Sequence, residues 1–268
     1  MIPVDAQTMF EIAPRFGGEN GERQAAIVRG VGEVLAATLD RYAINTPLRI
    51  AHFLGQTCHE SAGFRTTEEF ASGDAYEGRV DLGNTMPGDG RRYKGRGLIQ
   101  LTGRANYKTM AATLDMPLEA EPERAAAPVL SLTIACEFWK ANKLNPLCDA
   151  DDLDRVTRRI NGGTNGIDER RLFTSKAKNA IARLQALQLS GIQVPAAGGK
   201  KGATMPVLHR GASGEAVVDL QKRLRKFFPA LGVDGDFGPA TEVAVSRFQA
   251  DHNLVVDGIV GADTWAAL

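Results

Sequence analysis

The chain has 268 residues, of which 43% are hydrophobic, and its 32 Lys and Arg residues are balanced by 32 Asp and Glu residues. This composition excludes a disordered chain, and the length suits one medium and one small domain. A net charge of zero argues against a polyanion such as nucleic acid as the main partner. No apolar run approaches the ~20 residues that a membrane-spanning helix needs.

The N-terminal segment and the cysteines bear on where the protein is made. Residues 1–5 lack a basic segment followed by an apolar one, so we predict no secretory signal. An odd number of cysteines without an evident disulfide framework favours folding in a reducing cytosol. The cysteines are Cys58, Cys136 and Cys148.

Helical periodicity dominates the chain up to residue 189. Apolar residues recur at helical spacing over residues 27–35, 50–58 and 132–139. No sustained alternation of apolar and polar residues appears, so we predict a mainly α-helical domain. Segment 71–96 is rich in Gly and Asp and is long for a loop of a compact domain, which is typical of functional loops.

The helix predicted over residues 50–60 ends at a carboxylate. At about 100° per residue, its polar side opposes the apolar stripe and consists of His52, Gln56, His59 and Glu60. Glu69 follows within one loop. Two carboxylates suit cleavage of a glycosidic bond, which needs one carboxyl kept protonated and another kept ionised.

A glycine-hinged segment, residues 95–107, follows the two carboxylates. It carries three neutral polar groups, from Gln100, Thr102 and Asn106. Its first two glycines would let the backbone approach a sugar closely.

Metal-dependent and nucleophilic chemistry find less support. Position 63 is Gly63 and not the second histidine that a zinc protease helix requires. His52 and His59 share a helix face without a third ligand, so we predict no metal and no cofactor. Cys58 lies on the apolar stripe, which favours core packing over a role as nucleophile.

The last part of the chain reads as a separate module. Residues 190–206 are rich in Gly, Ala and Pro and are predicted to link a domain at 1–189 to one at 207–268. In the second, DGDFGPAT at 234–241 recurs loosely as DGIVGADT at 257–264, an offset of 23 residues. Each copy reads as an Asp-Gly turn leading into a helix, so we predict a small three-helix module.

Several ordered motifs in the first domain resemble glycoside hydrolase family 19. They are HESAGF at 59–64 with Glu68 and Glu69, YKGRGLIQLT at 93–102, Asn106-Tyr107, and INGG at 160–163. The similarity spans residues 51–171 and is greater to the phage endolysin branch than to plant chitinases. It implies a lysozyme-like, mainly helical catalytic domain over residues 1–189 and hydrolysis with inversion at the anomeric carbon.

The resemblance also implies roles for individual residues. Glu60 matches the general acid, and Thr102 stands where the family uses a hydroxyl to hold the attacking water. Glu69 matches the base of the phage branch, with Glu68 and Glu77 as rivals, because plant members place the base further along in a longer loop. The substrate-binding residues implied are His59, Gln100, Asn106, Tyr107 and Asn161.

Residues 207–268 resemble the bacterial peptidoglycan-binding domain type 1, which implies noncatalytic binding to the cell wall. On this basis, the ligand groove is expected near the two Asp-Gly turns, at Asp234, Phe237 and Asp257. Tethering of this kind would raise the local concentration of the catalytic domain on the wall.

Together the two resemblances predict an endolysin that cleaves peptidoglycan between N-acetylmuramic acid and N-acetylglucosamine for host lysis. We expect a monomer, made in the host cytoplasm and acting on the wall after release, with no nucleic acid partner and no stable membrane insertion. A chitinase on the same fold is the alternative. A wall-binding protein with an inactive catalytic domain is a third, which intact Glu60, Glu69, Gln100 and Thr102 disfavour.

Overall fold

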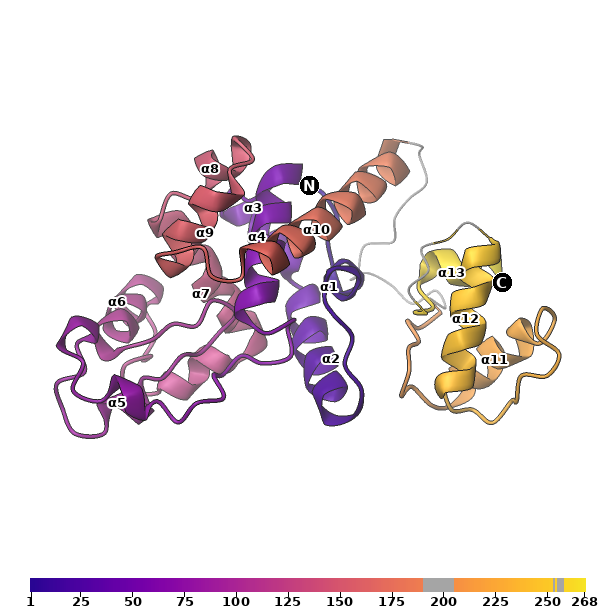
Figure 1. Cartoon of the computed structure of the whole chain (residues 1–268), viewed down its shortest axis with the longest axis horizontal. Coiled ribbons are helices and arrows are strands. Elements are labelled where there is room, and N and C mark those ends of the chain that lie inside the picture. Colours follow the sequence, from indigo (N-terminus) through magenta and orange to yellow (C-terminus); the bar gives the residue numbers. More distant parts are fainter. Residues whose placement is uncertain (190–204, 253, 255–257) are drawn as a thin grey trace. The chain divides into compact units, whose positions relative to one another are not determined.

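The computed structural model describes residues 1–189, 205–252, 254 and 258–268. The chain divides into two compact units, Met1–Gly198 and Gly199–Leu268 (Figure 1). Residues 190–204 of the predicted linker lie outside the described residues, and so does the point of division between the units.

The first unit is mainly helical, which confirms the predicted fold class. In the described part of the chain, pairing between extended segments is limited to isolated bridges, two of which join Arg96 to Glu68 and to Leu101. No helix within the same ranges is long and apolar enough to cross a membrane. The larger helices are α1 (Ala6–Ile12), α2 (Gly18–Gly32), α3 (Leu35–Arg41), α4 (Pro47–Glu60), α6 (Arg104–Leu114), α7 (Pro128–Ala141), α8 (Asn145–Asp149), α9 (Leu153–Asn161) and α10 (Ile167–Leu189).

Helix α4 forms where the sequence predicts a helix, and its N-terminus is well defined. The Thr46 side chain accepts a hydrogen bond from the Arg49 backbone N–H at 3.3 Å, and Pro47 occupies the first turn, where its missing N–H leaves no bond unmade. The apolar stripe of α4 packs into the main core of this unit. There the ring of Phe53 meets the ring of Trp139 edge-on, with centroids 5.1 Å apart.

The side of α4 predicted to be polar faces protein for most of its length, because α10 packs along it (Figure 1). His52 and Gln56 are fully buried as a result. Cys58 on the apolar stripe is buried as predicted, and burial raises the pKa of its thiol well above the ordinary value. A thiol held in its neutral form is a poor nucleophile.

The segment 71–96 contains short helical turns, η1 (Asp74–Tyr76), η2 (Val80–Leu82) and α5 (Asp89–Arg92). The Glu77 carboxylate ties them together by accepting hydrogen bonds from the backbone N–H groups of Gly88, at 2.7 Å, and Gly90, at 2.8 Å. A long loop closed on itself in this way presents a defined surface.

The second unit contains three helices among its described residues, as predicted for the module. They are α11 (Glu215–Leu224), α12 (Pro239–Asp251) and α13 (Ala262–Ala267). Their apolar faces share one core, to which Leu220, Phe237, Val245, Phe248 and Trp265 contribute.

A buried glutamine holds each copy of the repeat. Gln221 accepts a hydrogen bond from Gly235 N at 2.9 Å and donates to Thr241 Oγ1 at 3.0 Å. Gln249 bonds the second copy in the same way, to Gly258 N at 2.7 Å and to Thr264 Oγ1 at 3.1 Å. The sequence repeat therefore reflects one bonding pattern used twice, in which the glycine and the threonine of each copy are pinned to the helix before it.

Candidate active site

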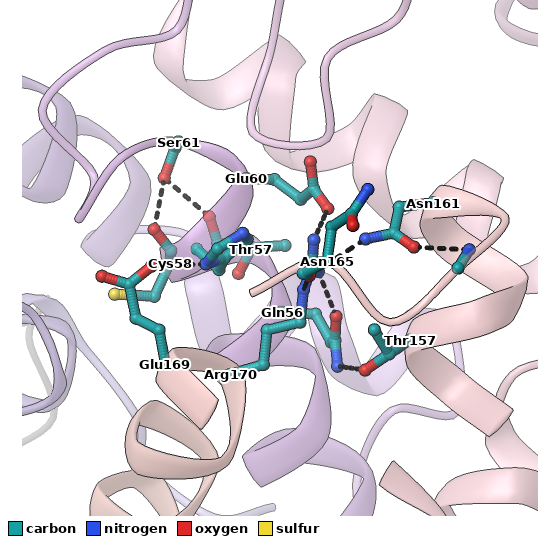
Figure 2. Close-up of polar contacts among 12 residues, drawn as sticks. Gln56, Thr57, Cys58, Glu60, Ser61, Thr157, Asn161, Asn165, Glu169 and Arg170 are labelled. Carbon is teal, nitrogen blue, oxygen red and sulfur yellow. Dashed lines mark hydrogen bonds and ion pairs between the residues drawn. The ribbon is translucent and has the colours of Figure 1, made fainter. Parts of the chain in front are cut away.

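Glu60 ends helix α4 and is held by an arginine from α10. Its Oε1 accepts a hydrogen bond from Arg170 Nη2 at 2.5 Å, in an ion pair whose arginine is 2% exposed and whose glutamate is 18% exposed (Figure 2). One carboxylate oxygen thus takes part in a fixed contact. The residual exposure of Glu60 leaves its side chain accessible to a ligand.

Arg170 is fixed in turn by a buried network. Its Nη1 donates to Gln56 Oε1 at 2.5 Å and its Nε donates to the backbone oxygen of Asn165 at 3.1 Å. The amide nitrogen of Gln56 donates to Thr157 Oγ1 at 3.0 Å (Figure 2). Gln56 therefore links Arg170 of α10 to Thr157 of α9, and a network whose members are all bonded holds its geometry rigidly.

Asn161 shapes the loop that carries Asn165. Its side-chain nitrogen donates to Asn165 O at 3.2 Å, and its oxygen accepts from Gly163 N at 2.8 Å (Figure 2). Gly162 ends helix α9 with a φ of 77°, which favours glycine. Asn161 is half-buried beside the Arg170 network, where the sequence placed a polar residue of the cleft.

His59 pairs with the residue before Arg170. Its Nδ1 lies 2.5 Å from Glu169 Oε2, and the imidazole is 22% exposed. Consecutive residues of α4, His59 and Glu60, thus meet consecutive residues of α10, Glu169 and Arg170. Each residue at the end of α4 is paired with one at the start of α10, so the contact fixes the register of the two helices.

Glu69, Gln100 and Thr102 converge on Gly95. A methyl group on Gly95 would lie 2.7 Å from Gln100 Oε1 and 3.2 Å from both Glu69 Oε2 and Thr102 Oγ1. The position is held by backbone pairing, because Glu69 N donates to Gly95 O at 2.9 Å. A glycine at position 95 is what allows three predicted functional side chains to meet.

One carboxylate oxygen of Glu69 accepts a hydrogen bond, and the other is buried. Tyr76 donates its hydroxyl proton to Glu69 Oε2 at 2.9 Å. Oε1 is enclosed and lacks a hydrogen-bond partner within the described structure. An enclosed acceptor without a partner is uncommon in proteins and points to a site that a water or substrate hydroxyl completes. Burial, and then the bond to Glu69, raise the pKa of Tyr76.

The turn after Gly95 is strained and internally bonded. Gln100 has a φ of 56°, a left-handed conformation that is uncommon outside glycine. Its side-chain nitrogen donates to Gly97 O, and Thr102 Oγ1 donates to Gln100 O, each at 2.9 Å. The Gln100 side-chain oxygen is directed toward Gly95 and Glu69. Strain at such a position is typical of functional sites.

The two rivals of Glu69 have other contacts. Glu68 forms ion pairs with Lys94 at 3.0 Å and with Arg96 at 3.3 Å, and its side chain is 44% exposed. Glu77 uses both carboxylate oxygens to close the loop around α5. The geometry favours Glu69, because it lies beside Thr102 and has an oxygen without a partner.

Asn106 and Tyr107 differ in their access to solvent. Asn106 is exposed and donates to Thr102 O at 2.8 Å. Tyr107 is fully buried, so the prediction that it contacts the sugar is wrong. Its hydroxyl donates to Lys94 O at 2.9 Å and accepts from Arg96 Nη1 at 3.3 Å, and burial raises its pKa to about 12. Tyr107 therefore supports the backbone and side chains around Lys94 and Arg96.

The predicted wall-binding residues are engaged inside the module. Asp234 Oδ1 accepts hydrogen bonds from Gln221 Nε2 at 2.7 Å and from Asp236 N at 3.0 Å. Phe237 is 1% exposed and belongs to the core, so it cannot stack on a sugar. Asp257 lies outside the described residues.

Arg170, Gln56 and Tyr76 are parts of the site that the sequence analysis missed. Gln56 precedes Glu60 by one helical turn, which was a usable signal because residues four apart share a helix face. Arg170 and Tyr76 gave no such signal, because their partners lie in other segments of the chain.

Comparisons with known proteins follow the same division of the chain. A family profile described as "Chitinase class I" matches residues 33–156, and one described as "Putative peptidoglycan binding domain" matches residues 213–268. A "Glycosyl hydrolase family 19 domain-containing protein" of Haemophilus influenzae is 33% identical over 175 residues, which are 53% of this chain and 85% of that protein.

Two further matches come from streptomycetes. A zinc D-Ala-D-Ala carboxypeptidase of Streptomyces albus G is 48% identical over 62 residues, covering 22% of this chain and 24% of that protein. The crystal structure of chitinase C from Streptomyces griseus HUT6037 superposes with a TM-score of 0.53 at 18% identity, covering 68% of this chain and 93% of the other. At this identity the superposition shows that the fold is shared.

Proposed function

The chain belongs to glycoside hydrolase family 19, and from this premise we propose that it hydrolyses the glycan strand of bacterial peptidoglycan. The observation that carries the proposal is the union, in one chain, of a family 19 catalytic unit with a module matching a peptidoglycan-binding profile. A glycosidase joined to a wall-binding module acts at a high local concentration of wall glycan.

Glu60 is the general acid and Glu69 the base. Glu60 donates its proton to the glycosidic oxygen while Glu69 takes a proton from the water that attacks the opposite face of the sugar ring. An inverting enzyme needs room for that water between carboxyl groups ~6.5–9.5 Å apart. Thr102 holds the water, a role supported by its hydroxyl lying beside Glu69 at Gly95.

The contacts of Glu60 fix its position in the site. Arg170 fixes one oxygen of the carboxyl group and leaves the other to meet the glycosidic oxygen. Because Arg170 is itself held by Gln56 and Asn165, the acid is positioned before substrate binds. A prepositioned acid avoids part of the cost of reorganisation during reaction.

The cleaved bond joins N-acetylmuramic acid to N-acetylglucosamine, and the biological role is lysis of a bacterial host by a phage-type endolysin. On this proposal the protein is a monomer made in the host cytoplasm that reaches the wall after release. Three buried, free cysteines support synthesis in a reducing compartment.

Chitin is the alternative substrate. It is favoured by the chitinase description of the matching family profile and by the fold shared with chitinase C. Both polymers contain N-acetylglucosamine, so the same acid and base chemistry serves for either. The substrate-binding surface therefore determines which polymer is cleaved.

The test measures reducing-sugar release from purified Gram-negative sacculi and from colloidal chitin, using the full chain. We expect release from sacculi, its loss in Glu60→Gln, and unchanged sedimentation of that variant with sacculi. Glu19→Gln, at an exposed position of α2, serves as the matched control. Activity on chitin alone would overturn the choice of polymer, and full activity of Glu60→Gln would remove Glu60 as the acid.

A further inference from the structure

An open hollow of about 530 Å³ has three arginines among its seven lining residues. We name it the arginine hollow. Its lining consists of residues 86–89, Arg91, Arg92 and Arg104. None of these residues has a part in the acid and base chemistry.

Two of the arginines are gathered over one ring. The guanidinium carbon of Arg104 lies 5.1 Å from the centroid of Tyr93, and that of Arg92 lies 5.7 Å from the same centroid. Stacking on an aromatic face stabilises each cation. It also brings two positive charges to one ring, and an anion that contacts both is attracted by both.

The acidic groups nearby leave this charge incompletely balanced. Asp89 is the carboxylate within the hollow's lining. It is 2% exposed, accepts from Met86 N at 2.9 Å, and lies 3.4 Å from Arg104 Nη2. Arg91 is paired outside the hollow with Asp74. Arg92 donates to the backbone oxygen of Ala120 at 2.7 Å.

The Arg104 guanidinium is only partly satisfied. Its Nε is enclosed without a hydrogen-bond partner in the part of the chain that the structure describes and lies 3.9 Å from Glu119 Oε1, so the donors it can offer to a ligand are those of its two terminal nitrogens. Arg92 and Arg104 are thus anchored by Tyr93 while retaining N–H groups to offer. A planar fork of donors held in this way suits a carboxylate.

The residues of the hollow are near the candidate catalytic residues in the sequence, and one of its helices packs against a turn that contacts Glu69. Arg104 opens helix α6 two residues after Thr102, and α5 packs against η1, which contains Tyr76. Tyr76 in turn contacts Glu69. The elements that line the hollow therefore pack against the turn whose Tyr76 bonds Glu69.

We propose that the arginine hollow binds a carboxylate of the peptide stems that peptidoglycan carries, and so favours this polymer over chitin. Stem peptides end in free carboxylates, whereas chitin has none. The inference rests on the proposed function and deepens it, because it gives the catalytic unit its own means of distinguishing the two polymers.

The test compares Arg92→Gln with the wild-type full chain on intact sacculi and on stripped sacculi, which are the glycan strands that an amidase frees of peptides and whose remaining carboxylates are the lactyl groups on the sugar. We expect the KM for intact sacculi to rise about tenfold, as for loss of one charge-assisted hydrogen bond, and the kinetics on stripped sacculi to stay unchanged. Arg92→Lys should restore part of the loss. Arg23→Gln, at an exposed position of α2, is the matched control and should behave as wild type.

The outcomes separate this inference from the proposed function. An equal loss on intact and stripped sacculi would overturn the hollow as a peptide site, and so would no loss on either. If the wild type cleaves neither form, the proposed function fails. The hollow is then tested by calorimetry with a synthetic stem tetrapeptide, whose binding must be present in wild type and weaker in Arg92→Gln.

Discussion

Glu60 and Arg170 join the last turn of α4 to the first turn of α10 through an ion pair of 2.5 Å. The arginine is 2% exposed, and it is also bonded to Gln56 and Asn165. A single buried side chain therefore connects three segments and sets the direction of the proposed acid.

Replacing Arg170 by lysine should lower kcat on sacculi by about ten- to a hundredfold with little change in KM. Lysine keeps the positive charge, but it lacks the fork of donors that serves Glu60, Gln56 and Asn165 at once. A misplaced acid affects the transition state more than substrate binding. Arg171→Lys, at the exposed neighbouring position, is the control. An unchanged kcat in Arg170→Lys would show that Glu60 is positioned without it.

Glu69→Gln should lower kcat by about a hundredfold or more, the usual range for loss of a general base. Glu68→Gln should cost less than about tenfold, because Glu68 forms ion pairs with Lys94 and Arg96 and is 44% exposed. The measurement is initial rate at saturating sacculi. A larger loss in Glu68→Gln than in Glu69→Gln would reverse the assignment of the base.

Gly95→Ala should lower kcat severely while the chain still folds. The new methyl group would lie 2.7 Å from Gln100 Oε1 and 3.2 Å from Glu69 Oε2, so these side chains must move apart. Displacement by a fraction of an ångström is enough to disrupt a catalytic arrangement. Gly17→Ala, where a methyl group meets nothing within 4 Å, is the control. Wild-type activity in Gly95→Ala would mean that the convergence at Gly95 does not matter for the reaction.

The sequence predicted the helix α4 and the two glutamates, but not what surrounds them. The period of the apolar residues identified the core face of α4, because that face packs on a conventional hydrophobic core. The opposite face reads as a solvated surface in sequence, yet it is buried under α10. His52 and Gln56 are polar there because they bond to Asp151, Thr157 and Arg170, and periodicity does not report distant partners.

Aromatic residues within motifs were the least predictable. Tyr107 and Phe237 stand next to polar positions in recognisable motifs, and both were assigned to ligand contacts. Both are buried, because a motif conveys the local fold as well as the site, and large aromatic side chains contribute most to packing. The roles of Gln221 and Gln249 in the module were also missed, because a buried amide side chain cannot be told from an exposed one in the sequence.

Gln221→Ala should lower the free energy of unfolding of the module by about 1–3 kcal/mol, because it removes the partner of the buried Gly235 N–H. Lys222→Ala, at the next and exposed position, should change it little. Denaturant unfolding followed by Trp265 fluorescence measures the difference in a Trp139→Phe background. Equal stability in the two variants would show that the repeat does not depend on its glutamine.

His52 should make the catalytic unit less stable as the pH falls. Burial lowers the pKa of His52 and outweighs the opposing effect of Asp151, whose Oδ1 lies 2.7 Å from His52 Nε2 and also bonds Lys178. The unfolded chain then takes up a proton near pH ~6.5 that folded His52 does not, so stability present above that pH is lost below it.

The slope for one such proton is at most about 1.4 kcal/mol per pH unit, and His52→Gln should remove it while keeping a donor to Asp151. Trp139 reports on this core because it contacts Phe53, and a Trp265→Phe background removes the signal of the module. Urea unfolding between about pH 5 and about pH 8 gives the two slopes. The same decline with falling pH in His52→Gln and its parent would place the titrating group elsewhere in the chain.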